Sequence, residues 1–69
     1  MKLSARNQIP AKVIAVVHGE ATANIELDAC GSRLVASITV EAANELKLAP
    51  GSEVVAIIKA SDVIVAVAD

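Results

Sequence analysis

Residues 22–40 read TANIELDACGSRLVASITV, and this stretch decides the fold. Its first part alternates strictly between apolar and polar side chains, with Ala23, Ile25 and Leu27 on one face. A period of two is typical of a strand with one buried face. The Ala-Cys-Gly-Ser segment at 29–32 then turns the chain, and residues 33–40 alternate again. We therefore predict a β-hairpin at the centre of the sequence.

Apolar segments on both sides of the hairpin predict further strands. Residues 13–17 are apolar on both alternating faces, which suits a strand buried on two sides, and a turn at His18 follows them. Residues 53–60 and 62–68 have the same character, and we expect a bend where the polar residues Ser61 and Asp62 join them. A polar segment precedes the first predicted strand.

Residues 41–47 change period and predict a short helix. Val40, Ala43 and Leu46 fall three apart, with acidic residues early and a lysine late, which suits the helix dipole. The Ala-Pro-Gly-Ser segment at 49–52 ends the helix, since proline disfavours helix in the residue before it. We therefore predict an all-β fold with one short helix, arranged as a five-stranded OB-type barrel. An SH3-like barrel is the competing fold.

The composition bounds the size and location of the protein. Its 69 residues predict a single domain over residues 1–69. The chain is 55% hydrophobic without any aromatic residue, so we expect a second apolar face that another subunit covers. No apolar run reaches the roughly 20 residues of a membrane-spanning helix, and the N-terminus lacks the apolar stretch of a signal peptide. We predict a cytoplasmic protein with no membrane partner.

Charge and reactive residues argue against two classes of function. The net charge is −2, and binders of single-stranded nucleic acid usually combine a basic groove with aromatic stacking platforms, so we predict no nucleic-acid partner. One histidine, one cysteine and no visible nucleophile–base pair argue against an enzyme. Glu41 and Glu45 lie four apart on the predicted helix and face solvent, so they do not form a catalytic pair. We predict no directly ligated metal.

Three short motifs give the chain a resemblance to a known family. They are Ser-Ala-Arg-Asn at 4–7, Ala-Ser-Ile-Thr at 36–39 and Lys-Ala-Ser at 59–61. In this order, and over nearly the full chain, they resemble the molbindin, or Mop, domain, whereas one motif alone would be weak evidence. The same domain occurs as a module in molybdate-responsive regulators and transporter ATPases. Because nothing is attached to it here, we expect a free-standing binding protein.

The resemblance implies a homohexamer, built as a trimer of dimers, that binds molybdate or tungstate between subunits as an intracellular store. A tetrahedral dianion presents only acceptor oxygens, so converging hydroxyl, amide and cationic donors suit it. The implied oxyanion-binding residues are Ser4, Ala5, Arg6, Thr39, Lys59, Ala60 and Ser61. The residues of the N-terminal segment would come from one subunit and the others from its partner.

Two positions bear on the implied sites. Ala42 stands where some relatives carry a serine, so the chain lacks one hydroxyl donor unless a backbone N–H at the helix start replaces it. A second type of anion site lies near the symmetry axis in the family, and His18 and Gly19 fall at a turn that could face it. On general grounds His18 is more often a plain turn residue.

Other interpretations of the same residues stay open. Arg6 alone would be a solvated surface charge, Lys59 a lysine with its stem along apolar surface, and Thr39 a helix cap, a role compatible with anion contact. Asn7 is more typical of a structural hydrogen bond than of a ligand. The alternative function is an OB-type interaction module that binds protein or nucleic acid without a small-molecule ligand.

Overall fold

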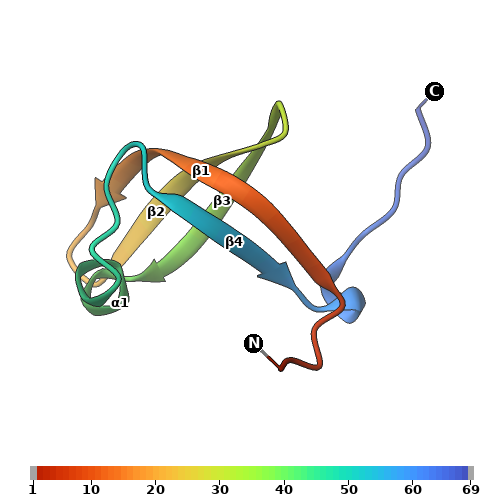
Figure 1. Cartoon of the computed structure of the whole chain (residues 1–69), viewed down its shortest axis with the longest axis horizontal. Helices are drawn as coiled ribbons and strands as arrows, with labels where there is room; N and C mark the ends of the chain where they lie inside the picture. Colours follow the sequence, from red (N-terminus) through yellow and green to blue (C-terminus); the bar gives the residue numbers. More distant parts are fainter. Residues whose placement is uncertain (1, 69) are drawn as a thin grey trace.

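The computed structural model describes residues 2–68 (Figure 1). Its elements are β1 (Asn7–His18), β2 (Thr22–Ala29), β3 (Ser32–Thr39), the helix α1 (Val40–Glu45), β4 (Glu53–Ile58) and the 3₁₀ turn η1 (Ala60–Asp62). The strands form one antiparallel sheet in the order β3-β2-β1-β4. The fold is therefore mostly β with one short helix, as the sequence predicted.

The predicted hairpin is present as β2 and β3, which pair along their whole length. Cys30 and Gly31 form its two-residue turn, with φ angles of 53° and 91°. Positive φ at both central residues matches the twist of the flanking strands. The Asp28 carboxylate holds the turn by accepting a hydrogen bond from the Gly31 amide at 2.8 Å.

β1 is longer than predicted because it pairs with two neighbouring strands. Residues 7–12 pair with β4 and residues 12–18 pair with β2. A β-bulge at Ile14 lies in the second half and bends the strand. Pro10 lies in the first half, which has a neighbour on one side only, the position where a strand tolerates proline. This bend carries the start of β1 away from the hairpin and toward β4.

The helix forms where the sequence predicted it. Thr39 is its N-cap, and the Thr39 hydroxyl oxygen accepts a hydrogen bond from the Ala42 amide at 3.0 Å. The loop after α1 is fastened to β1, because the Gly51 amide donates to the Val13 carbonyl at 2.8 Å. Gly51 has a φ of 95°, which glycine adopts without strain. The helix and this loop therefore position β4 beside β1.

The buried core is small. Its cluster consists of Val13, Ala23, Ile25, Leu27 and Ala43. Two of these five residues are alanines, which bury little apolar area, and a short chain hides a smaller share of its surface than a longer one. The chain by itself therefore leaves much apolar surface uncovered.

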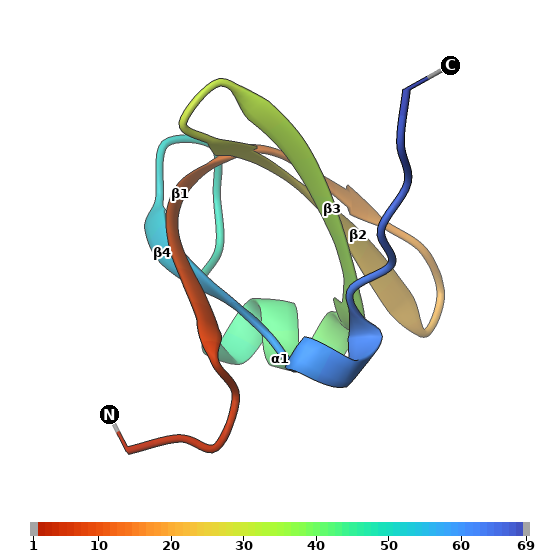
Figure 2. The ribbon, with the colours of Figure 1, turned by 90° about the vertical axis from the view of Figure 1, so that its right-hand side faces the viewer.

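The last predicted strand does not form within the chain. Residues 63–68, which we call the C-terminal arm, follow η1 outside the sheet and run away from it (Figures 1 and 2). Ile64, Val65 and Val67 are 93%, 84% and 87% exposed. A strand needs a neighbouring backbone for its hydrogen bonds, and within residues 2–68 the arm pairs with none. The described residues of the single chain therefore form a four-stranded sheet, and closure of the five-stranded barrel stays a prediction.

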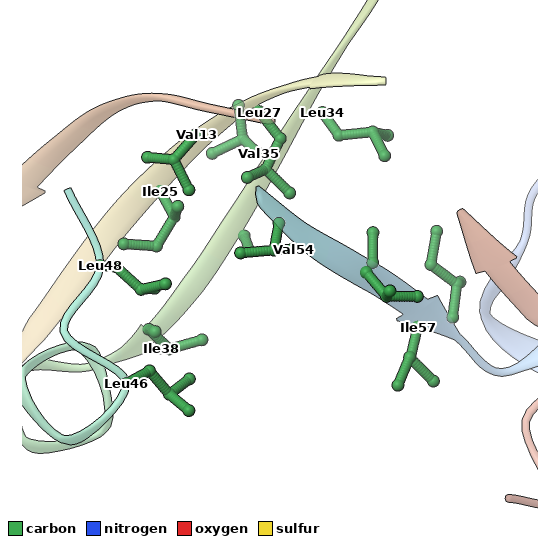
Figure 3. A pocket seen from close by; sticks show the side chains of 14 residues that line it. Val13, Ile25, Leu27, Leu34, Val35, Ile38, Leu46, Leu48, Val54 and Ile57 are labelled. Carbon is green, nitrogen blue, oxygen red and sulfur yellow. The ribbon is translucent and has the colours of Figure 1, made fainter. Parts of the chain in front are cut away.

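An apolar groove lies between the unpaired edges of β3 and β4 (Figure 3). Its volume is ≈ 270 Å³, and every residue that lines it is apolar. β3 contributes Leu34 and Ile38, β4 contributes Val54 and Ile57, and Leu46 after α1 lies at one end (Figure 3). The groove thus separates the two strands that a closed barrel would have to join.

We expect Ile25→Ala to lower the free energy of unfolding by about 2–5 kcal/mol, because it truncates a side chain that is 2% exposed and leaves a cavity. Urea denaturation followed by circular dichroism at one fixed protein concentration measures this loss. Ile14→Ala is the matched control, since Ile14 is 49% exposed, and we expect a clearly smaller loss. Equal losses at the two positions would contradict the placement of the core.

Candidate oxyanion-binding site

Two of the predicted donor segments leave the sheet at one corner. Asn7 and Ile58 form the last pair of the ladder between β1 and β4, and the Asn7 side-chain amide donates to the Ile58 carbonyl at 3.1 Å. Residues 4–6 lead into this pair and residues 59–61 lead away from it, so both segments start from the same end of the sheet (Figure 1). Asn7 therefore has the structural role that the sequence favoured.

The side chains of these segments are uncommitted donors. Ser4, Arg6, Lys59 and Ser61 are exposed, and within residues 2–68 none of them makes a side-chain hydrogen bond or an ion pair. Arg33 behaves differently, because its Nε lies 2.7 Å from the carboxylate of Glu26. The corner therefore has two cationic groups and two hydroxyls available for an external acceptor.

The turn that follows β4 adds backbone donors. In η1 the Asp62 amide donates to the Lys59 carbonyl at 2.9 Å, and the Val63 amide donates to the Ala60 carbonyl at 3.3 Å. The first amides of a helical turn have no acceptor inside it, so those of Ala60 and Ser61 are left for other partners. The amide of Ala60 was one of the predicted donors. Ala5, the other predicted backbone donor, is half-buried beside Arg6.

Thr39 lies elsewhere in the chain. It ends β3 and begins α1, and Figure 1 shows α1 and η1 at opposite ends of the molecule. The capping role of Thr39 is confirmed, since its hydroxyl oxygen accepts from the Ala42 amide. The sequence grouped Thr39 with Lys59 and Ser61 on one subunit, and the structure does not bring these residues together in one chain.

A family model described as the TOBE domain matches residues 3–65. The chain belongs to this family. Its resemblance to the molbindins is confirmed by full-length similarity to the "Probable molybdenum-pterin-binding protein" of Haemophilus influenzae, which is 41% identical over 68 residues. The alignment covers 97% of this chain and 99% of that relative.

Solved structures agree with this membership of the molbindin family. The molybdate binding protein from Sporomusa ovata is 41% identical, with a TM-score of 0.92, over 96% of this chain and 98% of that one. A structure of the cytoplasmic molybdate-binding protein ModG with molybdate bound is 43% identical, with a TM-score of 0.84, over 87% of this chain and 43% of that one. The molbindin relatives are binding proteins, so the chain belongs to a non-catalytic family, as the sequence predicted.

The other positions that the molbindin resemblance singled out lie in α1 and at the end of β1 with the turn after it. The Ala42 amide donates to the Thr39 hydroxyl oxygen within the chain, and replacement of the missing serine hydroxyl by a backbone N–H at the helix start stays a prediction. His18 ends β1 and is exposed, while the Gly19 amide donates to the Thr22 carbonyl at 2.8 Å. A Cβ at Gly19 would lie 2.9 Å from that carbonyl oxygen, so the turn itself requires glycine. A second anion site at His18 and Gly19 stays a prediction.

Two further features bear on the chemistry of this molbindin. Across residues 2–68, no three His, Cys, Asp or Glu side chains gather in a metal-binding cluster. No helix in that range is long and apolar enough to cross a membrane. The sequence did not identify the groove between β3 and β4, although the high apolar fraction predicted a second apolar face.

We expect Thr39→Ala to lower the free energy of unfolding by about 1 kcal/mol, because the first turn of α1 loses its cap. Thr39→Ser keeps a hydroxyl at the cap and should retain most of the stability. Thermal unfolding of the three proteins at one concentration, without ligand, measures the difference. A Ser variant as unstable as the Ala variant would contradict the capping role.

Proposed function

We propose that this protein binds molybdate, and tungstate by the same chemistry, with the donor segments at residues 4–6 and 59–61. The observation that carries the proposal is that both segments leave the sheet at one corner with uncommitted cationic and hydroxyl groups. Support also comes from relatives described as molybdate-binding, one of them with molybdate bound. Arg6 and Lys59 supply charge, while Ser4, Ser61 and the backbone amides of Ala5 and Ala60 supply direction.

The complete site belongs to the seam between subunits. In one chain the corner is exposed, and water and salt weaken the attraction between an exposed cation and an anion. Two corners packed against each other would place Ser4, Ala5 and Arg6 of one subunit over Lys59, Ala60 and Ser61 of its partner. Thr39 and Lys59 lie at opposite ends of the folded molecule (Figure 1). Thr39 would therefore contact this site only if it came from a different subunit than the one that supplies Lys59.

The C-terminal arm of a second copy fits the groove between β3 and β4. The arm is an apolar segment without a strand neighbour, and the groove is an apolar space bordered by two unpaired strand edges. An added strand would satisfy the backbone groups of both edges and bury the exposed valine and isoleucine side chains. The arm would thus be the fifth strand of an OB-type barrel that closes between chains.

This exchange gives a dimer, and we propose that three dimers form the homohexamer that the molbindin resemblance implies. Val17 supports a second contact, because its apolar side chain is 62% exposed on β1, outside the groove. Reversible capture needs no covalent step, so the assembly would act as a cytoplasmic store that buffers the oxyanion.

We expect molybdate to bind the wild-type protein. Arg6→Ala or Lys59→Ala should weaken binding by about 10- to 100-fold, because each variant loses the free energy of a hydrogen bond to a charged group. Isothermal titration calorimetry with molybdate, and with sulfate for comparison, measures this. Lys12→Ala is the matched control, because exposed Lys12 lies at the far end of the β1–β4 ladder and its loss changes the net charge equally. No heat with wild-type protein, or equal weakening by all three variants, would contradict the site.

We expect Val65→Glu to dissociate the assembly, because it places a charge on the arm where the groove is entirely apolar. Val17→Glu is the comparison variant, since Val17 is 62% exposed and lies outside both the arm and the groove, so this variant should keep the exchanged dimer while it loses the second contact. Size-exclusion chromatography with light scattering gives the mass of each variant. A chain that lacks residues 63–69 should also be monomeric, and an intact oligomer without these residues would contradict the exchange.

A further inference from the structure

We infer that η1 is a hinge through which a bound oxyanion holds the C-terminal arm in the partner subunit, so that loading with molybdate slows the exchange of subunits. The inference rests on the proposed function, because it takes residues 59–61 as ligands and the arm as the partner's fifth strand. What it adds is a regulation of that site: the ligand would control how long two subunits stay joined.

The hinge and the proposed ligands are the same residues. Lys59 is the N-cap of η1, and Ala60 and Ser61 are its first two residues. The arm starts at residue 63, so only Asp62 separates it from Ser61. Any contact that fixes the Ser61 hydroxyl and the turn amides therefore also fixes the direction in which the arm leaves.

Without a ligand, the hinge is weakly held. Two backbone hydrogen bonds, of 2.9 and 3.3 Å, close the turn, and the N-cap Lys59 adds no side-chain bond. Residues 59–68 are all exposed, so no buried contact supports the turn within the chain. Hydrogen bonds of 3₁₀ geometry are poorer than those of an α-helix, and exposed segments with few apolar contacts open at low cost.

On the other side of the proposed ion, the backbone beside Arg6 is anchored in the sheet. Arg6 lies next to Asn7, which is paired with Ile58 in the sheet and hydrogen bonded to the Ile58 carbonyl. An anion held between η1 of one subunit and Arg6 of its partner would therefore tie the hinge to a rigid point. Opening the hinge would then require the loss of contacts to the ion.

Linkage sets the size of the effect. An anion that binds the joined state better than the separated state stabilises the joined state by the same coupling free energy. For one site, a ligand at 100 times its Kd favours the state it binds about 100-fold. If release of the arm limits exchange, the exchange rate falls by about tenfold or more on loading.

The experiment mixes isotope-labelled and unlabelled pools of the full chain and follows mixed oligomers by native mass spectrometry. Exchange is measured without ligand, with molybdate at about 100 times its Kd, and with sulfate at the same ionic strength. We expect slowing of at least about tenfold with molybdate and none with sulfate. An unchanged rate with molybdate bound, as shown by equilibrium dialysis, overturns the inference; absence of bound molybdate overturns the proposed function instead.

A second comparison isolates the hinge. Two glycines inserted between Asp62 and Val63 keep the alternation of the arm but uncouple it from the turn, so we expect molybdate binding to persist and the slowing to disappear. The same insertion between Cys30 and Gly31, in the distant hairpin turn, is the matched control and should keep the slowing. Full slowing in the Asp62 variant overturns the hinge role.

Hydrogen exchange gives a readout in the wild-type protein, which keeps the test independent of whether the insertion variant assembles. We expect molybdate to slow amide exchange in residues 59–68, because the hinge opens less often. Amide protection in this segment that does not change with bound molybdate overturns the inference.

Discussion

The unpaired edges of β3 and β4 impose the constraint on which the rest of the structure depends. Backbone groups and apolar side chains line both edges, and the buried cluster of five residues leaves the chain little stability of its own. The same chain carries an apolar arm that pairs with nothing in its own described residues. In the proposed dimer, a second chain would cover the unpaired edges and would also lie beside the donor corner, so assembly and oxyanion binding would depend on the same surfaces.

The path of β1 relates the unpaired strand edges to the donor corner. β1 pairs with β2 through residues 12–18 and with β4 through residues 7–12, and the bulge at Ile14 lies in the part that pairs with β2. The first half then ends beside Ile58, which brings the segments before β1 and after β4 to one corner. The register of β1 against β4 thus decides which distant parts of the sequence become neighbours.

Local patterns were enough to predict part of this fold. Strict alternation and a Cys-Gly turn identified the hairpin, and spacing of three with a threonine before it identified α1. The full length of β1 was missed, because Asn7 and Pro10 interrupt an apolar pattern although inward-facing Ile9 and Ala11 continue its period of two. Periodicity indicates which side chains of a segment are buried, but it does not indicate which strand the segment pairs with.

The same limit explains what happened to the last strand and to the candidate site. Residues 63–68 have the composition of a strand, but no local signal states whether the pairing partner belongs to the same chain. The three motifs were enough to identify the family, yet Thr39 and Lys59 share no sequence feature that records their separation in space. That separation follows from strand order and register, which only the three-dimensional structure contains.

Pro10 has a consequence for how such a protein avoids aggregation. It lies in the half of β1 that has one strand neighbour, and it has no amide hydrogen to offer on the other side. That flank is therefore a poor template for an incoming strand, which leaves addition at β3 and β4, where one strand fills both edges. Growth by strand addition would then end in a finite, closed particle instead of continuing as a fibre.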